Sequence, residues 1–274
     1  MKKERTVESI AYERMMGGVF KLLMEGVDAA PSIPEEEFLK TTPEGCSMPP
    51  PPVQKEPDPT KKTIDLPKPE SIKVNEINLR DAIEKRRSLR DYSDKPLSLM
   101  ELSWLLWCTQ GVRNINASRT ATLRNVPSAG SRHPIETYLL VNNVEGLQPG
   151  LYRFLALEHK LVEVNLDSSL LDEVVKLTWN QQFVRKCAVV FFWVGIVSRT
   201  AWRYSYGAYR VLLLDAGHVC QNLYLAAEVV DAGACAIGAF VSAGLGRLFG
   251  LIEDEEIVLY VASLGKKKVT SANT

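Results

Sequence analysis

The stretch GAYRVLLLDAGHVCQNLYLAAEVVDAGACAIGAF, residues 207–240, decides the fold. Its apolar residues occupy most sides of a helical turn, so we predict a long helix from Gly207 to Val230, with Gly233 as its C-cap. A helix that is apolar nearly all round belongs at the centre of a large core or in a subunit interface. The ACAIGAF that follows is predicted to be a short extended segment.

The segments that flank this helix predict an α+β fold. CAVVFFWVGIV, residues 187–197, is the most β-prone run and is typical of a strand buried on both faces. Ser98 and Glu101 form a capping box for a helix that ends at Gly111, and a loop is predicted from there to Asn125. Further strands are predicted at 137–144, 151–164 and 255–265, and further helices at 79–87, 170–179 and 242–251. The absence of a regular βαβ rhythm favours helical layers around a mixed, mostly antiparallel sheet.

The first 71 residues differ in character from the rest of the chain. Residues 1–30 have the pattern of a short amphipathic helix. Eleven of the fifteen prolines fall between Pro31 and Pro69, and such a segment forms neither a packed helix nor a central strand. We therefore predict an extended arm at 31–71, which crosses to another subunit or caps a pocket, and a globular domain at 72–274.

Composition excludes several classes of protein. The 274 residues contain 33 Lys and Arg against 33 Asp and Glu, whereas a nucleic-acid binder usually carries a basic excess. No apolar run has the length of a membrane-spanning helix, and glutamates interrupt the N-terminus too often for a signal peptide, so we expect a cytoplasmic protein without membrane contact. The five cysteines and three histidines are too scattered for a metal site, and most of the cysteines are expected to be reduced and buried.

Four separated segments carry the chemistry that the sequence offers. Two are basic, namely RRSLRDY at 86–92 and LGKKK at 264–268. Two are rich in small residues, namely PSAGSRHP at 127–134 and GACAIGAF at 233–240. Guanidinium groups suit oxyanions, so the basic pair can converge on one phosphate while the small-residue pair lines an aromatic ring. Taken alone, the Arg cluster also fits a solvated helix face.

In order and spacing, these motifs resemble the FMN-dependent nitroreductase family, and within it the branch of azoline oxidases that act in peptide maturation. The resemblance spans about Leu79 to Lys268 and also rests on PLSLMELSWLLWCTQG, PSAGSRHPIETYLLVNNVEGLQPGLYRF and VASLG. It implies a three-layer dimeric fold in which the long helix forms much of the dimer interface. It also implies that FMN is the cofactor.

The resemblance further implies a role for each motif. Arg86 is expected to hold the FMN phosphate, Ser88 with Arg87 the phosphate or ribityl chain, and Arg90 the pyrimidine end of the ring. Ile237 and Gly238 are expected to present backbone N–H groups to flavin N5. Pro127, Ser128, Ala129 and Gly130 are expected to reach the ring from the opposite subunit. The phosphate grip is completed by Gly265, Lys266 and Lys267. The expected catalytic residues are Arg90, Arg203 and Tyr204. The substrate pocket is expected to be lined by Arg203, Tyr204 and Arg132.

The implied activity is that of a homodimeric oxidoreductase. It passes hydride between NAD(P)H or an organic substrate and a second acceptor by a ping-pong route. A first alternative is a flavin-dependent dehydrogenase or oxidase of a peptide-derived heterocycle. Against it, Arg203 and Tyr204 stand where azoline oxidases carry Lys-Tyr, and arginine is a poor general base. A second alternative is a non-catalytic interaction protein that uses its arm and keeps a degenerate flavin pocket.

Overall fold

The computed structural model describes residues 34, 36–37, 40 and 42–268. The predicted helix at 1–30 lies outside these residues. The strands are β1 (Thr63–Asp65), β2 (Val112–Ile115), β3 (Thr122–Arg124), β4 (Ile135–Val141), β5 (Gly150–Leu155), β6 (Lys160–Asn165), β7 (Val189–Ile196), β8 (Ala232–Ile237) and β9 (Glu256–Lys266). The helices are α3 (Leu79–Lys85), α4 (Leu99–Gln110), α5 (Leu170–Leu177), α6 (Phe183–Lys186), α7 (Val197–Tyr204), α8 (Ala208–Val229) and α9 (Ser242–Phe249).

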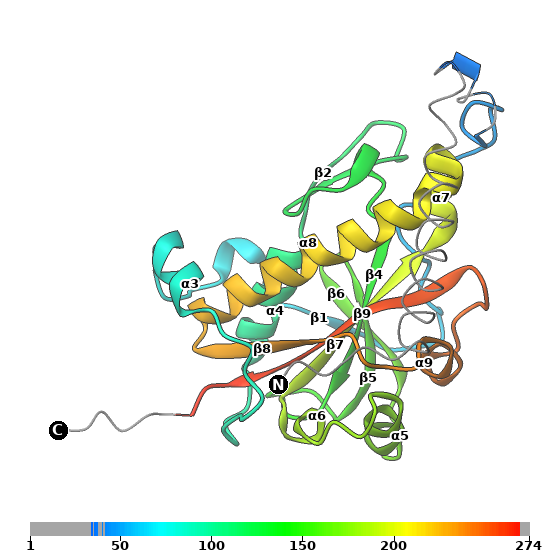
Figure 1. The fold of residues 1–274 in the computed structure, drawn as a ribbon. Helices are drawn as coiled ribbons and strands as arrows, with labels where there is room; N and C mark the ends of the chain where they lie inside the picture. Colours follow the sequence, from blue (N-terminus) through cyan, green and yellow to red (C-terminus); the bar gives the residue numbers. More distant parts are fainter. Residues whose placement is uncertain (1–33, 35, 38–39, 41, 269–274) are drawn as a thin grey trace, which may run out of the picture.

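One seven-stranded sheet organises the chain (Figure 1). Its strand order is β1-β6-β5-β4-β7-β9-β8, and every pairing between neighbouring strands is antiparallel. The central strand β7 is the predicted buried run, and it pairs with β4 on one side and β9 on the other. Its side chains are buried on both faces because helices cover both sides of the sheet.

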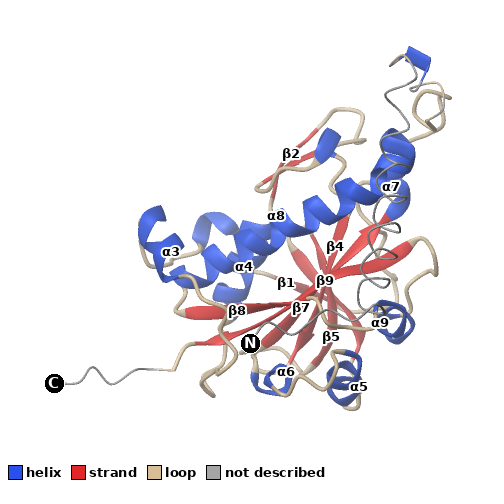
Figure 2. Cartoon of the chain, viewed as in Figure 1, coloured by secondary structure: helices blue, strands red, loops and turns tan. Residues whose placement is uncertain are grey.

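Helices form a layer on each face of the sheet, and each layer has its own core (Figure 2). On one face, α4 and α8 pack against alternate β7 side chains, among them Phe191 and Trp193. On the other face, α5 and α9 pack against Val190 and Phe192. This alternation follows from the two-residue period of a strand. The predicted α+β fold, with a mostly antiparallel sheet between helices, is confirmed.

The long helix α8 serves the core with only one of its sides. Leu212, Val219 and Leu223 are buried against the sheet, whereas Leu213 and Leu214 are 44% and 57% exposed. Tyr209 is also exposed. A helix with apolar residues on its outer side as well as its inner side leaves that outer side available for another surface.

Several local predictions were right, and others were wrong for identifiable reasons. The capping box of Ser98 and Glu101 is formed in both directions, and α4 ends at Gly111. Gly233, however, is not the C-cap of α8, because Val230 takes that position and Gly233 lies inside β8. The predicted loop at 112–125 contains the hairpin of β2 and β3. The helix α7 was not predicted, because its eight residues, VSRTAWRY, are shorter than the window of about 11–18 residues over which a helical pattern is recognised.

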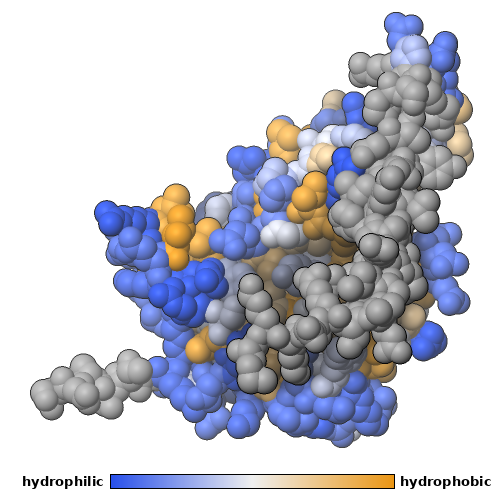
Figure 3. Space-filling model, viewed as in Figure 1, coloured by the Kyte–Doolittle hydropathy of each residue, from blue (hydrophilic) through white to orange (hydrophobic). Residues whose placement is uncertain are grey.

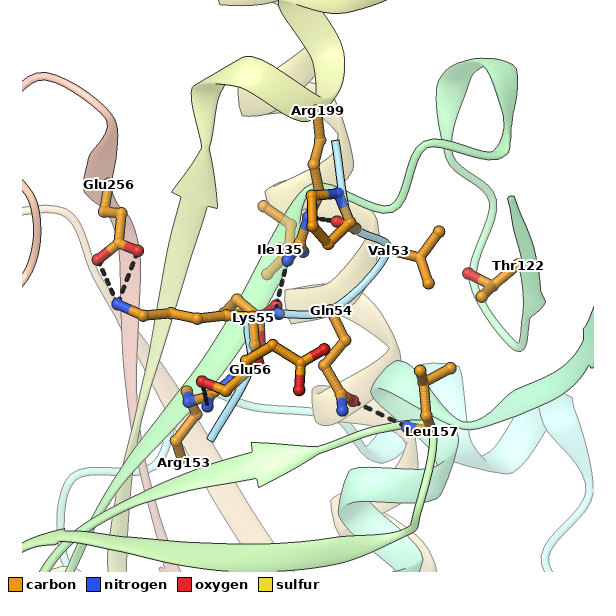
Figure 4. Close-up of polar contacts among 12 residues, drawn as sticks. Val53, Gln54, Lys55, Glu56, Thr122, Ile135, Arg153, Leu157, Arg199 and Glu256 are labelled. Atoms are coloured by element: carbon orange, nitrogen blue, oxygen red, sulfur yellow. Dashed lines mark hydrogen bonds and ion pairs between the residues drawn. The ribbon is translucent and has the colours of Figure 1, made fainter. Parts of the chain in front are cut away.

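The described part of the arm packs on its own protomer. Residues 63–65 pair with β6 and become the edge strand β1. Upstream, residues 52–56 lie over buried charged groups (Figure 4). Their main-chain carbonyls accept hydrogen bonds from three arginines: Arg199 to Pro52 at 2.7 Å, Arg124 to Val53 at 3.2 Å, and Arg153 to Lys55 and Glu56 at 2.7 and 3.0 Å. The arm is therefore held mainly through its backbone at this point.

One carboxylate pairs with two of these three arginines. Glu136 on β4 is 4% exposed and forms ion pairs with Arg199 at 2.6 Å and Arg153 at 3.2 Å. It also accepts the backbone N–H of Lys55 at 2.8 Å. Burial by itself raises the pKa of Glu136, but Arg199 and Arg153 hold it below its ordinary value. Glu136 is therefore a charged anchor on which both the sheet and the arm depend.

Candidate functional site

The first basic motif lies beside β8. The chain leaves α3 at Arg86 and runs along the strand, where the Leu89 N–H donates to the Ala234 carbonyl at 2.9 Å. Gly233 allows this approach, because a Cβ atom there would lie 2.6 Å from Leu89 Cδ2. The first basic motif and the third motif, GACAIGAF, are therefore neighbours although about 140 residues separate them.

The Tyr224 hydroxyl ties this region together. It lies 3.0 Å from Ser88 Oγ and accepts the backbone N–H of Ala236 at 2.8 Å. The guanidinium of Arg86 lies over the Tyr224 ring, 5.3 Å from its centroid. One buried side chain on α8 thus fixes the basic motif and the end of β8 relative to each other. The sequence prediction did not include Tyr224, since its role depends on contacts with distant residues.

The arginines of the first motif present free charge to solvent. Arg87 and Arg90 are exposed, and none of the ion pairs among residues 42–268 includes Arg86, Arg87 or Arg90. Arg87 donates only to the main-chain carbonyls of Glu84 and Arg86. Arg90 lies over the Phe183 ring at 5.9 Å. Three cations without a carboxylate partner form a surface that suits an anion.

The second basic cluster, LGKKK at 264–268, lies at the C-terminal end of α8, as the first motif does. Its lysines, however, already form ion pairs. Lys267 pairs with Glu228, which lies one helical turn after Tyr224. Lys266 pairs with Glu101 at 2.6 Å and is mostly buried. Gly265 packs on Tyr92, since a Cβ atom there would lie 2.8 Å from the ring. The two clusters therefore converge, although Lys266 points toward α4 and its charge is already neutralised.

Ile237 and Gly238 end β8 close to the first motif. The Ile237 side chain is 2% exposed and belongs to the core, so only its backbone is available to a ligand. Gly238 follows the strand, and a Cβ atom there would have no neighbour within 4 Å. The predicted backbone role of this pair is compatible with its position and remains a prediction.

The PSAG loop, Pro127 to Gly130, lies near the other end of α8. Ser128 Oγ donates to the carboxylate of Asp215 at 2.6 Å and accepts the backbone N–H of His133 at 2.9 Å. Burial raises the pKa of Asp215, and the bond from Ser128 partly offsets this. Asp215 precedes Tyr224 by nine residues, which is about 14 Å along a helix at 1.5 Å per residue. Within one chain, the PSAG loop therefore stands apart from the first motif.

Arg203 and Tyr204 meet the PSAG loop. Gly130 has a φ of 58°, and a Cβ atom there would lie 2.8 Å from Arg203 Cδ and 2.9 Å from Tyr204 Oη. A glycine is needed at this position because the backbone is left-handed and the approach is close. Arg203 forms an ion pair with Glu44 of the arm at 2.8 Å. The two predicted pocket residues are thus placed beside the loop that is predicted to contact the flavin ring.

Two other residues of PSAGSRHP, Arg132 and His133, have structural roles. Arg132 is buried, donates to the carbonyls of Arg199 and Thr120, and lies over the Trp202 ring at 4.6 Å. Its guanidinium therefore holds the loop in place. Arg132 was predicted to line the substrate pocket, but its burial leaves it no open pocket to line. Burial lowers the pKa of His133 to about 3, so its imidazole is neutral near pH 7. No cluster of metal-ligating side chains occurs within the described residues.

Apolar side chains are exposed on α3 and on α8. Leu79 and Ile83 on α3 are 66% and 56% exposed, and Leu79 lies near Leu225 and Val229 in the C-terminal half of α8. Orange patches mark this face over α3 and α8 in Figure 3. Between these helices and α4, Trp104 and Trp107 line a hollow of about 350 Å³. Exposed apolar area of this kind marks an interaction surface. None of the helices in the described part of the chain is long and apolar enough to span a membrane.

Comparison with known proteins identifies the fold. The model of the nitroreductase family matches residues 83–266. A Methanocaldococcus jannaschii protein named as a nitroreductase, MJ1384, is 31% identical over 194 residues, which are 71% of this chain and 93% of the relative. The trifolitoxin-processing protein TfxB of Rhizobium leguminosarum is 29% identical over 121 residues, which are 43% of this chain and 32% of the relative.

Solved structures agree on the architecture. A chain from Anabaena variabilis, also named as a nitroreductase, superposes with a TM-score of 0.61 at 28% identity, covering 77% of this chain and 42% of its own. A chain of the Escherichia coli microcin synthetase McbBCD, solved with truncated pro-MccB17 bound, gives 0.56 at 17% identity and covers 98% of this chain and all of its own. A Desulfovibrio desulfuricans chain, solved in complex with FMN, gives 0.51 at 18% identity and covers 73% of this chain and 93% of its own.

Proposed function

Because the chain belongs to the nitroreductase family, we propose that it is an FMN-dependent oxidoreductase that works as a homodimer. The observation that carries this proposal is the meeting of the first motif, the end of β8 and Lys267 on the C-terminal half of α8. Three arginines without acidic partners lie there, beside a strand end that small residues leave open. This is the donor set that a phosphate and a flat ring require.

The residues present fit FMN at both ends. Arg86 and Ser88 would hold the phosphate dianion, and Lys267 would join them when it releases Glu228. The backbone of Ile237 and Gly238 would support the ring, and Arg90 would supply positive charge at its edge. When bound, FMN supplies hydride transfer in both directions, which allows a reductant and an acceptor to use one pocket in turn.

Dimerisation would bring the two halves of the site together. The α8 residues that contact the PSAG loop and the first motif, Asp215 and Tyr224, are about 14 Å apart along the helix in one chain. A two-fold axis across the exposed side of α8 would set the PSAG loop of one protomer against the first motif of the other. The exposed leucines of α8 and α3 supply the apolar area that such an interface needs.

The residues at the PSAG loop would shape the pocket for the reacting partner. Asp215 fixes Ser128, and Gly130 lets Arg203 and Tyr204 approach. NAD(P)H is the proposed reductant. A guanidinium does not remove a proton near neutral pH, so Arg203 would position the reacting partner and screen its negative charge. Tyr204 would offer a hydroxyl that can donate or accept a hydrogen bond.

A second candidate is the dehydrogenation of a peptide-derived heterocycle. It is favoured by similarity to TfxB, whose name describes trifolitoxin processing, and to a chain of the microcin synthetase McbBCD, which was solved with truncated pro-MccB17 bound. In that case a substrate, and not NAD(P)H, would reduce the cofactor, with oxygen as the acceptor. Arg203 in place of a lysine argues against a proton-abstracting role at that position.

A direct test begins with the purified protein. We expect it to be yellow and to release FMN on denaturation. Rapid bleaching by NADPH or NADH in a stopped-flow experiment supports a reductase, and indifference to both nicotinamides supports the heterocycle dehydrogenase. Colourless protein that takes up no added FMN would leave only an interaction role and would refute the proposal.

A further inference from the structure

The arm holds α7 by three main-chain contacts. The Glu44 N–H donates to the Trp202 carbonyl at 2.9 Å, and Trp202 Nε1 donates to the Met48 carbonyl at 2.9 Å. Arg199, in the first turn of α7, donates to the Pro52 carbonyl at 2.7 Å. Contacts at both ends of an eight-residue helix determine where its last residues lie. Those last residues are Arg203 and Tyr204.

A fourth contact is an ion pair with the predicted pocket residue. Arg203 Nη1 lies 2.8 Å from Glu44 Oε1, and 45% of the Arg203 side chain is exposed. The second oxygen of Glu44 is buried and has no hydrogen-bond partner among the described residues. Glu44 also acts on Arg132, since burial lowers the pKa of Arg132 and Glu44 opposes that effect. One arm carboxylate therefore balances the charge beside Gly130.

We propose that Glu44 is a positioning residue that holds Arg203 against the PSAG loop and neutralises the charge that a substrate meets there. This inference rests on the proposed function for its substrate pocket. With Glu44 in place, Arg203 is occupied and the pocket favours uncharged acceptors. Without the carboxylate, the guanidinium is free to bind an anionic acceptor. The arm thereby contributes to substrate selection from a segment 159 residues away in the chain.

The test compares two acceptors that differ in charge. The full-length, FMN-loaded protein is assayed with 4-nitrobenzoate and with 4-nitrobenzamide. We expect Glu44→Gln to lower the KM for 4-nitrobenzoate about three- to fivefold, as the loss of a partly exposed ion pair allows, and to leave the KM for 4-nitrobenzamide within about twofold. Glu44→Asp should restore most of the original ratio. In the double variant Glu44→Gln/Arg203→Gln, the shift should disappear.

The matched control is Glu56→Gln, which makes the same chemical change at an exposed arm residue whose carbonyl binds Arg153 of β5. Hydrogen exchange of the α7 amides is measured in the same set of variants. Exchange in the last turn should accelerate about threefold in Glu44→Gln and in the double variant, and should stay unchanged in Glu56→Gln. An unchanged ratio of the two KM values in Glu44→Gln overturns the proposal. If the protein binds no FMN, the proposed function fails, and unchanged α7 exchange then overturns the positioning role by itself.

Discussion

Two arginine-rich regions of this protein behave in opposite ways. Arg86, Arg87 and Arg90 lie within five residues of one another, are accessible, and pair with no carboxylate among the described residues. Arg124, Arg153 and Arg199 come from three distant parts of the chain and are 2–4% exposed. In this second group, hydrogen bonds to the arm and the two ion pairs of Glu136 compensate the loss of water.

The exposed arginines are available to bind a ligand, whereas the buried arginines already use their charge in contacts within the fold. Burial lowers the pKa of Arg124 to about 10, which records the cost of removing its charge from water. The exposed group carries no such cost and keeps its hydrogen-bonding capacity for a partner. A local cluster of like charges therefore indicates a binding surface here, whereas the dispersed arginines stabilise the arm.

The largest effect is expected when the buried anchor is changed. Glu136→Gln should lower the free energy of unfolding by about 3–5 kcal/mol, because two buried guanidinium groups lose their counter-charge. Urea denaturation measures this, with the exposed Glu84→Gln as the control, which should cost under about 0.5 kcal/mol. A loss as small as that of the control would mean that the buried arginines do not depend on Glu136.

The Glu136 carboxylate also makes the free energy of unfolding depend on pH. Its pKa in the folded protein lies below the unfolded value, so its stabilisation is complete above the unfolded pKa, which is about 4.3. We expect that contribution to be lost as the pH falls through the lower, folded value. Urea midpoints of the wild type and Glu136→Gln should therefore approach each other in acid. A difference that stays constant down to acid pH would contradict this assignment.

The exposed cluster should respond more in binding than in stability. Arg86→Ala should weaken FMN binding about 10- to 100-fold, in line with a charge-assisted hydrogen bond worth about 1.5–3 kcal/mol. The unfolding free energy should fall by at most about 1 kcal/mol, through loss of the contact with the Tyr224 ring. Flavin fluorescence titration gives the affinity, and Arg80→Ala on the neighbouring α3 is the control. Equal affinities in the two variants would remove Arg86 from the phosphate site.

Tyr224 links the exposed cluster to the core and should show a mixed effect. Tyr224→Phe removes the hydroxyl that contacts Ser88 and the Ala236 N–H. We expect a loss of about 1 kcal/mol in stability and a three- to tenfold weaker affinity for FMN. Thermal melts of the FMN-free and FMN-loaded protein separate the two contributions. A stability loss without any change in affinity would make Tyr224 purely structural.

The smallest expected effect concerns the electronic state of the cofactor. Arg90→Ala should lower the reduction potential of bound FMN by about 20 mV, equivalent to about 1 kcal/mol for a two-electron couple, since a cation favours the reduced, anionic ring. Spectroelectrochemical titration of the loaded variant measures it, with Arg87→Ala for comparison. A potential equal to that of the wild type would show that Arg90 does not act on the ring.

Features that depend on residues close together in the sequence could be predicted, and features that depend on contacts between distant residues could not. The capping box of Ser98 and Glu101 and the hydrophobic run of β7 were predicted because their signals lie within a few residues. Gly233 was misplaced, because its need for glycine comes from Leu89 in another part of the chain. Tyr224, Asp215 and Glu44 were absent from the predicted site, since each acts on a partner at least 87 residues away.

The sequence by itself determined the α+β class, the long helix and the four motifs, because periodicity and local hydrogen bonding are written in consecutive residues. Only the tertiary structure decided which charges are free. It placed the first motif and β8 around Tyr224, set Lys266 against Glu101, and laid the arm over Glu136. The physical reason is that the energy of a charge depends on burial and on its partner, and neither is fixed until distant segments pack together.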